Sequence, residues 1–449
     1  MWRRLAEWLD RFVSKYVPDA FPLAFILLFI TVVLARVLTG SSFLDISFHM
    51  GKGFWTLVGF TTQIVMTLVL GHVVASTPLV GGWLRRLAIS LRSPRSTIFT
   101  TSMVSNALNW VNPAIGMLGS AVLAKEVITY NRRVPAGLVV AAAYAGMVPH
   151  ALGMSAAMFM SVATPGHPLE SVIGIIPISQ TALWLPNVLL SLGLSVSMAA
   201  VFTLMLPRTA DLEDEPGGAL VGTPDGQETR ADGLCEETEK TPAGIVERSP
   251  VLSILSGVML AIGVVEIFRR GGAITFDSVN LILFSVGLLL HRGMSSFANA
   301  VKAAVAPMYG TLMNFPVYGA IMGIMAGTGL AKVIADWFVS FSSAATLPLY
   351  SFWSAGIINV FIPSAGGQWV VQGPVMAPAA MALGVLPAKV VSAVAVGDTW
   401  TNMIQPFWAL PILGITGRRV KEIVPYTFAI ALWIGVFVSM WIRFVYPLF

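Results

Sequence analysis

One acidic residue lies deep within a long apolar stretch, in the sequence A-V-G-D-T-W-T-N-M-I-Q-P-F-W (395–408). Asp398 is followed within two helical turns by the hydroxyl of Thr399 and the amides of Asn402 and Gln405. A carboxylate is costly in a membrane-type segment and marks a functional position by default. These oxygens could coordinate a small cation, or the carboxyl group could carry a proton. The alternative is a structural role, in which Asp398 serves a backbone or amide group.

A second group of polar residues surrounds a break in the apolar stretch Ser354–Gly384. Pro363 and the two glycines that follow it prevent this stretch from continuing as one helix. Irregular backbone within a bilayer persists only where it is buried in protein or lines a cavity. The break therefore predicts the tip of a re-entrant hairpin that meets a solute, with ordinary kinked helices as the alternative. The polar and glycine residues near this tip are Asn359, Ser364, Gly366, Gly367, Gln368 and Gln372.

A weaker copy of the same pattern occurs about 250 residues earlier. The sequence N-W-V-N-P-A-I-G (109–116) shares Asn, Pro and Gly at the same spacing with N-V-F-I-P-S-A-G (359–366). In each copy the next apolar run opens with a short V-P-A or L-P-A sequence. The repeated order indicates an internal duplication. It predicts a first hairpin with Asn109, Asn112 and Gly116 at its tip.

The two predicted tips suit a small anion. Asn112 is an expected N-cap, and the N-terminus of a helix presents unpaired N–H groups and a partial positive charge to a carboxylate. No Lys or Arg occurs at either tip, which favours a monocarboxylate with an apolar tail. Trp369 and Trp400 could wall an apolar pocket or simply pack. His150 could line the path, titrate, or be a satisfied hydrogen-bonding residue.

Two overlapping sets of site residues follow. The predicted substrate contacts are Asn109, Asn112, Gly116, His150, Asn359, Ser364, Gly366, Gly367, Gln368, Trp369, Gln372, Trp400 and Asn402. The predicted ligands of a coupling ion, H⁺ or Na⁺, are Asp398, Thr399, Asn402, Gln405, Asn109 and Asn359. No metal-ligand or nucleophile spacing occurs, so no catalytic residue, no other cofactor and no enzyme is predicted.

The composition defines the class of protein. Apolar residues make up 56% of the 449 residues, charged residues only 11%, and the mean hydropathy is +0.79. These values predict a polytopic α-helical membrane protein. The net charge of +5 comes from basic residues that flank apolar segments, so they are expected to set topology and not to bind nucleic acid. The single Cys235 excludes an intramolecular disulfide.

About nine crossings and two hairpins are expected, at about 20 residues for each crossing. The crossings are predicted at 22–39, 54–76, 134–162, 178–206, 251–268, 279–291, 307–330, 388–415 and 423–445. The hairpins are predicted at 97–124 and 349–383, and the runs 134–162 and 388–415 are predicted as broken helices. The basic N-terminal segment and residues 81–92 are expected to lie along the membrane interface.

The polar segment 207–249 divides the chain. Its Glu, Asp, Gly, Thr and Pro residues predict a disordered cytoplasmic linker. It follows an N-terminal repeat (1–206) and precedes a connecting helix (250–276) and a C-terminal inverted repeat (277–449).

The distribution of Lys and Arg favours hairpins that return to their own side. With a cytoplasmic N-terminus, 20 basic residues fall in the cytoplasm and seven outside, and the C-terminus lies outside; this obeys the positive-inside rule. Full crossings would instead place Arg132 and Arg133 outside. The connecting helix then inverts the second repeat, and inverted repeats with discontinuous helices are typical of secondary transporters.

Two long sequences carry a family resemblance, I-N-V-F-I-P-S-A-G-G-Q-W-V-V-Q-G-P (358–374) and G-D-T-W-T-N-M-I-Q-P-F-W-A-L-P (397–411). With shorter matches along nearly the whole chain, they resemble the bacterial short-chain fatty acid transporter family (AtoE type), within the ion transporter superfamily. The resemblance implies a homodimer in the inner membrane, with scaffold and transport domains and an elevator stroke. It also implies uptake of butyrate or acetoacetate with a cation. By position, it places Asn109, Asn359, Ser364 and Gly366 at the tips, with Asp398 and Asn402 in the partner broken helix.

The prediction is therefore a secondary active transporter that imports short-chain monocarboxylates with H⁺ or Na⁺ across a lipid bilayer. A transporter or exchanger of the same fold for a di- or tricarboxylate remains an alternative. A channel is disfavoured by the paired, oppositely facing hairpins. A membrane-embedded sensor is disfavoured because no folded soluble domain is evident in the sequence.

Overall fold

The protein is helical throughout the part that the structure describes. The computed structural model describes residues 20–131, 133–207, 241–305, 308–359, 362, 364–404 and 407–449. Every secondary-structure element in these ranges is an α-helix or a short 3-10 helix. The predicted all-α fold class is confirmed. The basic segment at the N-terminus and residues 208–240 of the predicted linker lie outside the described residues.

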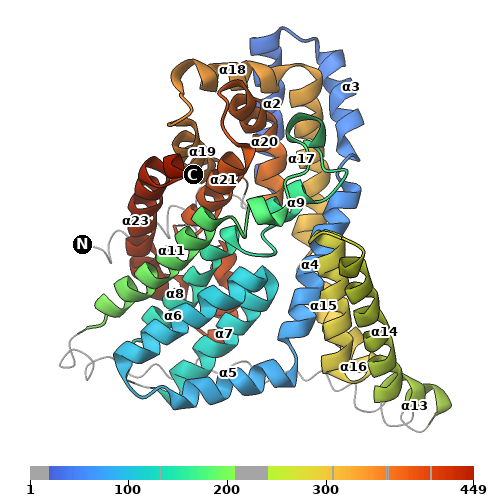
Figure 1. The fold of residues 1–449 in the computed structure, drawn as a ribbon, viewed down its shortest axis with the longest axis vertical. Helices are drawn as coiled ribbons and strands as arrows, with labels where there is room; N and C mark the ends of the chain where they lie inside the picture. The colour runs from blue at the N-terminus through green and yellow to red at the C-terminus, as the bar shows by residue number, and fades with distance from the viewer. Residues whose placement is uncertain are drawn as a thin grey trace.

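The chain before the linker begins with three helices and a helix expected at the interface, followed by a hairpin and an interrupted helix (Figure 1). In order, they are α2 (Ala20–Thr39), α3 (Phe43–Phe54), α4 (Val58–Ala75), α5 (Pro78–Ser90), α6 (Pro94–Val111), α7 (Pro113–Tyr130), α8 (Ala136–Tyr144), η1 (Ala145–Met147), η2 (Pro149–Leu152), α9 (Ala157–Ala163), α10 (Glu170–Ile173), η3 (Ile178–Gln180) and α11 (Leu185–Leu204).

After the linker, the same order of elements recurs behind two connecting helices. They are α13 (Pro242–Arg248), α14 (Pro250–Arg269), α15 (Phe276–His291), α16 (Met294–Val305), α17 (Tyr309–Gly327), α18 (Leu330–Phe341), α19 (Leu347–Asn359), α20 (Ala365–Ala382), α21 (Pro387–Thr401), η6 (Phe407–Ala409), α22 (Leu410–Thr416), α23 (Val420–Phe444) and η7 (Tyr446–Leu448). In Figure 1, α5 and the α6–α7 pair lie in the lower part of the molecule, and α18 to α20 lie in the upper part.

All nine apolar runs predicted to cross the membrane coincide with helices. Five helices in the described ranges are long and apolar enough to span a bilayer; a sixth span results if α17 and α18, bent by 73°, count as one. Helices α2 and α15 contain shorter apolar stretches. The fold is thus that of a multi-pass membrane protein.

The first predicted hairpin folds as two antiparallel helices, α6 and α7. At its base, Asn131 after α7 donates a side-chain hydrogen bond to Thr97 Oγ1 in the first turn of α6 (2.7 Å). Near its tip, Asn109 Nδ2 donates to Ser120 Oγ (3.2 Å). Because the start of α6 and the end of α7 are bonded to each other, the pair enters and leaves at the same side.

The second hairpin, α19 and α20, is joined by amide side chains. Gln368 Nε2 donates to the carbonyl oxygen of Ala355 (3.0 Å), and Gln372 Nε2 donates to Ser354 Oγ (3.0 Å). Further along, Ser351 Oγ donates to Met376 Sδ (3.4 Å), so residues later in α20 contact residues earlier in α19, as an antiparallel pair requires.

The interrupted helix of the first half bends around the first hairpin tip. After η2, the backbone N–H of Met154 donates to the carbonyl oxygen of Trp110 (2.8 Å). Gly153 allows this approach, because a Cβ at that position would lie 2.2 Å from the same carbonyl oxygen. The backbone at the break of the interrupted helix thus provides a hydrogen bond to a carbonyl group at the end of α6.

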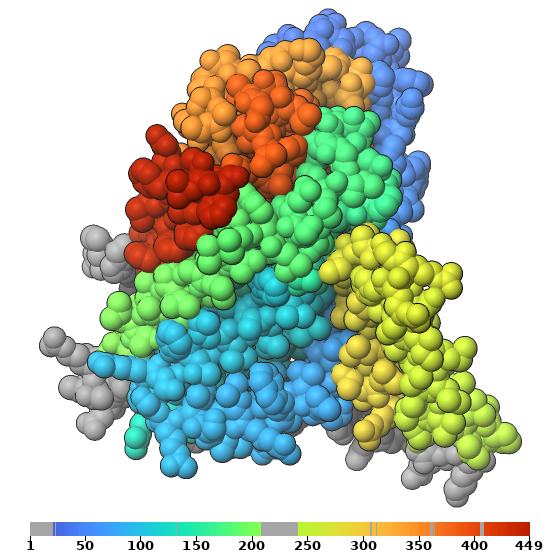
Figure 2. All heavy atoms as spheres, in the orientation of Figure 1, coloured from blue at the N-terminus to red at the C-terminus, as the bar shows by residue number. Residues whose placement is uncertain are grey.

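Helix α14 shows how the outer surface meets its surroundings. It packs on α15 through Ser253, which donates to the carbonyl oxygen of Leu288 (2.7 Å), and through Gly257, which contacts Leu289. Most of its other side chains, such as Met259 and Ile262, are apolar and exposed. This helix lies at the right edge of Figure 2. An exposed apolar face of this kind is suited to lipid.

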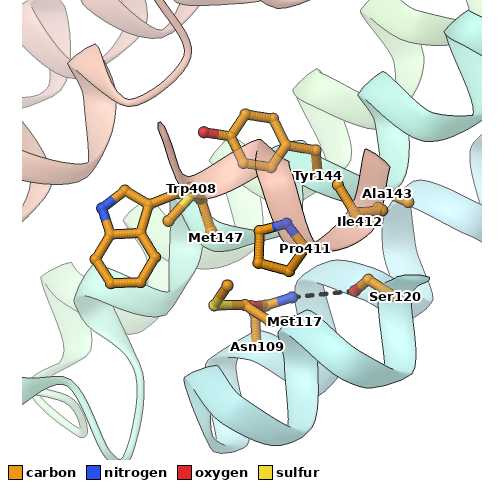
Figure 3. Close-up of a pocket in the computed structure, with 9 residues that line it drawn as sticks. All are labelled: Asn109, Met117, Ser120, Ala143, Tyr144, Met147, Trp408, Pro411 and Ile412. Atoms are coloured by element: carbon orange, nitrogen blue, oxygen red, sulfur yellow. Dashed lines mark hydrogen bonds between the residues drawn. The ribbon is translucent and has the colours of Figure 1, made fainter. Parts of the chain in front are cut away.

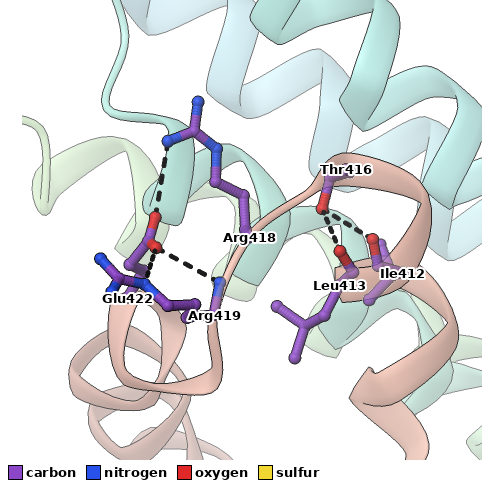
Figure 4. Close-up of polar contacts among 6 residues, drawn as sticks. All are labelled: Ile412, Leu413, Thr416, Arg418, Arg419 and Glu422. Atoms are coloured by element: carbon purple, nitrogen blue, oxygen red, sulfur yellow. Dashed lines mark hydrogen bonds and ion pairs between the residues drawn. The ribbon is translucent and has the colours of Figure 1, made fainter. Parts of the chain in front are cut away.

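The turn from α22 to α23 is held by one carboxylate (Figure 4). Glu422 Oε1 accepts hydrogen bonds from the backbone N–H (3.3 Å) and the side-chain Nε (3.4 Å) of Arg419. Its Oε2 lies 3.6 Å from Arg418 Nη1. Gly417 makes the turn itself in the left-handed region, at φ = +64°. These contacts set the position of α22, which borders the site described below.

Glycine allows α3 and α17 to touch at their backbones. A Cβ at Gly323 would lie 2.4 Å from the carbonyl oxygen of His49 and 2.7 Å from the Cα of Gly53. A Cβ at Gly319, on the same face of α17, would lie 2.7 Å from the carbonyl oxygen of Gly53. Small residues at such crossings are typical of helices that associate within membranes.

We expect Gly323→Ala to push α3 away from α17, because the backbone atoms that oppose it cannot move independently. Overpacking of this kind costs about 1–3 kcal/mol, and the thermal unfolding midpoint of the detergent-solubilised protein should fall. The matched control is Gly310→Ala in the same helix, where no atom lies within 4 Å of the added methyl. Equal midpoints for the two variants would contradict the close contact.

Candidate functional site

The two hairpins and the two interrupted helices meet at one enclosed space, the central cavity, of about 80 Å³. Segments about 250 residues apart in the sequence therefore share a single site. Its walls come mainly from the hairpin tips and the helix breaks, and α4 closes one side. The lining residues are Ile64, Leu68, Asn109, Pro113, Met117, Met147, His150, Ala157, Ser364, Ala365, Gly366, Asp398, Thr399, Asn402 and Trp408.

At the first tip, Asn109 faces the cavity while its neighbours hold the backbone. Asn112 caps α7, since its Oδ1 accepts from the N–H groups of Ala114 (2.9 Å) and Ile115 (3.1 Å). Gly116 leaves room for Asn109, because a Cβ there would lie 2.2 Å from the Cγ of Asn109. The Oδ1 of Asn109 is buried and accepts no hydrogen bond from any described residue.

At the second tip, the first residues of α20 line the cavity. Ser364 caps the helix by accepting from the N–H of Gly367 (3.4 Å). Gly366 lies at the cavity wall. Gly367 instead packs against Tyr318, whose ring would lie 2.5 Å from a Cβ at that position. The first N–H groups of a helix have no partner within it and carry a partial positive charge, so this wall can receive an anion.

Asp398 is buried at the cavity, with 2% of its surface exposed. Its Oδ1 accepts no hydrogen bond from any residue that the structure describes. Thr399 also lines the cavity, and its hydroxyl lies 3.3 Å from the carbonyl oxygen of Val148. Gln405 lies outside the described residues. A buried carboxylate oxygen without a hydrogen bond is costly, which identifies Asp398 as the residue of this site that needs a ligand.

A chain of hydrogen bonds connects the second hairpin with both interrupted helices. Asn359 Nδ2 donates to Oδ1 of Asn402 (2.8 Å) and to Oγ1 of Thr401 (2.9 Å). Tyr144, at the end of α8, donates its hydroxyl to the carbonyl oxygen of Asn402 (2.8 Å). Asn402 lines the cavity. Asn359 lies behind Asn402, and its hydrogen bond orients the Asn402 side chain.

His150 is buried in the wall of the cavity, in η2. Its Nδ1 lies 3.1 Å from the carbonyl oxygen of Met147. If Nδ1 carries the proton, this bond fixes the ring and leaves Nε2 as an acceptor.

Several residues predicted from the sequence contribute to packing and do not line the cavity. Gln368 and Gln372 join α19 to α20 as described above. Trp400 donates from Nε1 to the carbonyl oxygen of Ala431 (2.7 Å) and stacks on Phe352 with ring centroids 4.8 Å apart. Trp369 is buried beside Gly373.

Sequence reasoning did not assign site roles to Met117, Met147 and the α4 residues Ile64 and Leu68, which line the cavity. Apolar residues within membrane helices carry no local signal of this kind, because most face lipid or packing partners. Trp408 also lines the cavity, and its position near the break in the second interrupted helix is a signal that could have identified it.

The oxygens at this site limit the type of cation it could hold. No group of three or more His, Cys, Asp or Glu side chains placed to bind a metal occurs in the described ranges. A cation at Asp398 would therefore depend on neutral oxygens, such as Oδ1 of Asn109. Such a donor set suits Na⁺ or a proton on the carboxylate more than a transition metal.

Known proteins resemble the chain over its whole length. The family described as "Short chain fatty acid transporter" matches residues 1–445. A protein of Escherichia coli (strain K12) is 33% identical over 437 residues, covering 96% of this chain and 97% of its own. A protein of Haemophilus influenzae is 30% identical over 432 residues, covering 94% and 95%. Both carry the name "Putative short-chain fatty acid transporter".

The fold is also similar to the crystal structure of the Alcanivorax borkumensis YdaH transporter, which is described as having an unusual topology. The TM-score is 0.61 over 96% of this chain and 100% of that chain, at 18% identity. At this identity the likeness concerns the fold alone. The match of the family to nearly every residue, with two relatives at 30% identity or more, shows that the chain belongs to the short-chain fatty acid transporter family.

Proposed function

We propose that the protein imports short-chain monocarboxylates, such as butyrate or acetoacetate, together with a coupling cation that is H⁺ or Na⁺. The observation that carries this proposal is the Asp398 carboxylate, buried in the central cavity and without a hydrogen bond at Oδ1. Among the described residues, no Lys or Arg lines the cavity. A carboxylate substrate would bring a second negative charge beside the first. A proton or cation must therefore bind with it to offset the cost of burying both.

The geometry also supports a carboxylate at the second hairpin tip. Ser364, Ala365 and Gly366 form the N-terminus of α20 at the cavity wall. Backbone N–H groups there can donate to the substrate oxygens. None of the described Lys and Arg residues lines the cavity at the second hairpin tip. A substrate with one carboxylate therefore suits the cavity better than one with two or three.

An elevator-type movement belongs to the same proposal. The central cavity lies where α4 meets the hairpins, and only Ile64 and Leu68 in its lining come from α4. Hydrogen bonds join the two interrupted helices through Tyr144 and Asn402, the second hairpin to Asn402 through Asn359, and the first hairpin to its interrupted helix through Trp110 and Met154. A unit joined in this way could carry the site past α4. The homodimer and the inner-membrane location, with the N-terminus in the cytoplasm, rest on the resemblance to the family.

Two other functions compete with this proposal. A transporter or exchanger of the same fold could carry another small anion, such as a di- or tricarboxylate. Succinate or citrate would then outcompete butyrate. A channel would give uptake that does not saturate and does not follow an imposed cation gradient.

The first test is uptake of labelled butyrate into proteoliposomes, with Na⁺ and pH gradients imposed separately. We expect butyrate to accumulate above its external concentration with one of the two gradients. Accumulation with Na⁺ alone would identify Na⁺ as the coupling ion, and accumulation with a pH gradient alone, in excess of that in protein-free liposomes, would identify the proton. Failure to accumulate with either gradient, or with both together, would contradict symport and favour exchange or a different anion.

We expect Asp398→Asn to abolish gradient-driven accumulation. The amide does not bind a proton near neutral pH, and it carries no charge that would attract a cation. Exchange of internal for external butyrate can persist, since the contacts at the second tip are unchanged. The control is Asp336→Asn, which removes an exposed carboxylate paired with Lys332 and should accumulate butyrate normally. Normal accumulation by the Asp398 variant would remove this residue from the coupling role.

A further inference from the structure

A second, smaller hollow adjoins the central cavity and is called the side pocket here (Figure 3). It encloses about 20 Å³. Both hollows are lined by Asn109, Met117, Met147 and Trp408, so they lie next to each other with these side chains between them. The side pocket extends away from the second hairpin tip toward α22, which contributes Pro411 and Ile412.

The surface of the side pocket is mainly apolar, and its hydrogen-bond donors from Tyr144 and Asn109 are already engaged, while Oδ1 of Asn109 is an acceptor without a partner among the described residues. The Tyr144 hydroxyl is donated to the carbonyl oxygen of Asn402 (2.8 Å). Ser120 Oγ accepts from Asn109 Nδ2, which also donates to Ser105. The remaining walls are Met117, Ala143, Met147, Trp408, Pro411 and Ile412. No positively charged side chain of the described ranges lines the pocket, so it offers little to a carboxylate and suits an alkyl group.

We propose that the side pocket receives the alkyl end of the transported carboxylate and sets the longest chain that the protein accepts. This inference rests on the proposed function and adds the residues that determine specificity. The carboxylate lies at the N-terminus of α20, and the chain passes between Met117, Met147 and Trp408. Its end then meets Ala143 and Ile412.

The sizes of the two hollows agree with a short chain. A space of about 10–15 Å³ on this measure holds one group of the size of a water molecule. The side pocket therefore holds about one methyl group, and the central cavity holds several groups of that size. Ile412 is 4% exposed and Ala143 is fully buried, so both walls are backed by protein and a longer chain would have to displace packed side chains.

The test is a competition experiment with the full-length protein in proteoliposomes. Uptake of labelled butyrate is inhibited by unlabelled straight-chain monocarboxylates from acetate to octanoate, for wild type and for variants. Ile412→Ala enlarges the pocket and should improve inhibition by hexanoate relative to butyrate. The expected change is about fourfold for each methylene that gains room. Ala143→Val narrows the pocket and should shift the preference toward propionate and acetate.

The control is Ile415→Ala, a change of the same size in the same helix at a position that does not line the pocket. It should leave the order of inhibitors unchanged. Each variant is first checked for monodispersity by size-exclusion chromatography. Ile412→Val, which removes one methyl, replaces Ile412→Ala if the larger deletion does not fold.

The outcomes separate this inference from the function on which it rests. Opposite shifts in the two pocket variants support it. Butyrate uptake with an unchanged order of inhibitors in both would overturn the side pocket as the alkyl site and leave the proposed function standing, as would a shift of the same size in Ile415→Ala. If the wild type takes up no monocarboxylate under any gradient, the proposed function fails and the inference fails with it.

Discussion

A helix that stops inside a membrane exposes backbone N–H and C=O groups that water cannot reach, so other parts of the protein must satisfy them. In the described part of the chain, the two hairpin tips and the two broken helices contain such interruptions, and cap residues or neighbouring segments satisfy several of the exposed groups. Asn112 caps the start of α7, and the carbonyl of Trp110 receives the N–H of Met154 from the neighbouring broken helix. Tyr144 closes the backbone at Asn402. Because the interruptions satisfy one another, they gather at one place, and the central cavity forms there.

The same gathering explains why a lone carboxylate can have a functional role. Asp398 is buried beside neutral amides and hydroxyls, and none of the described Lys and Arg residues lines the cavity around it. In such surroundings, the charge that binds to Asp398 must come from outside the protein. A transported anion meets the same requirement in the same space. The proposed coupling of an anion to a cation rests on this electrostatic requirement.

The outer helices, such as α3, α14 and α17, surround the hairpins and interrupted helices and provide the surface suited to lipid. Helices α3 and α17 contact each other through Gly53, Gly319 and Gly323, where a side chain would separate the backbones. Helix α14 turns most of its apolar side chains outward. Their association depends on shape more than on the hydrophobic effect, because lipid is as apolar as the side chains.

The sequence by itself predicted nine crossings, and five or six of the described helices are long and apolar enough to span a bilayer. It determined the helical class, the two helix pairs predicted as hairpins and the exceptional place of Asp398. These properties are local: they depend on the length of apolar runs, on Pro and Gly, and on the cost of a charge in a membrane. Only the tertiary structure decided which polar residues face the cavity. Gln368, Gln372 and Trp400 brace helices, while Asn109, Ser364 and Asn402 line the space, because the rotation of each helix is set by packing. The apolar lining, including Met117 and Ile412, was also decided there, since an apolar residue has the same sequence signature whether it faces lipid, protein or substrate.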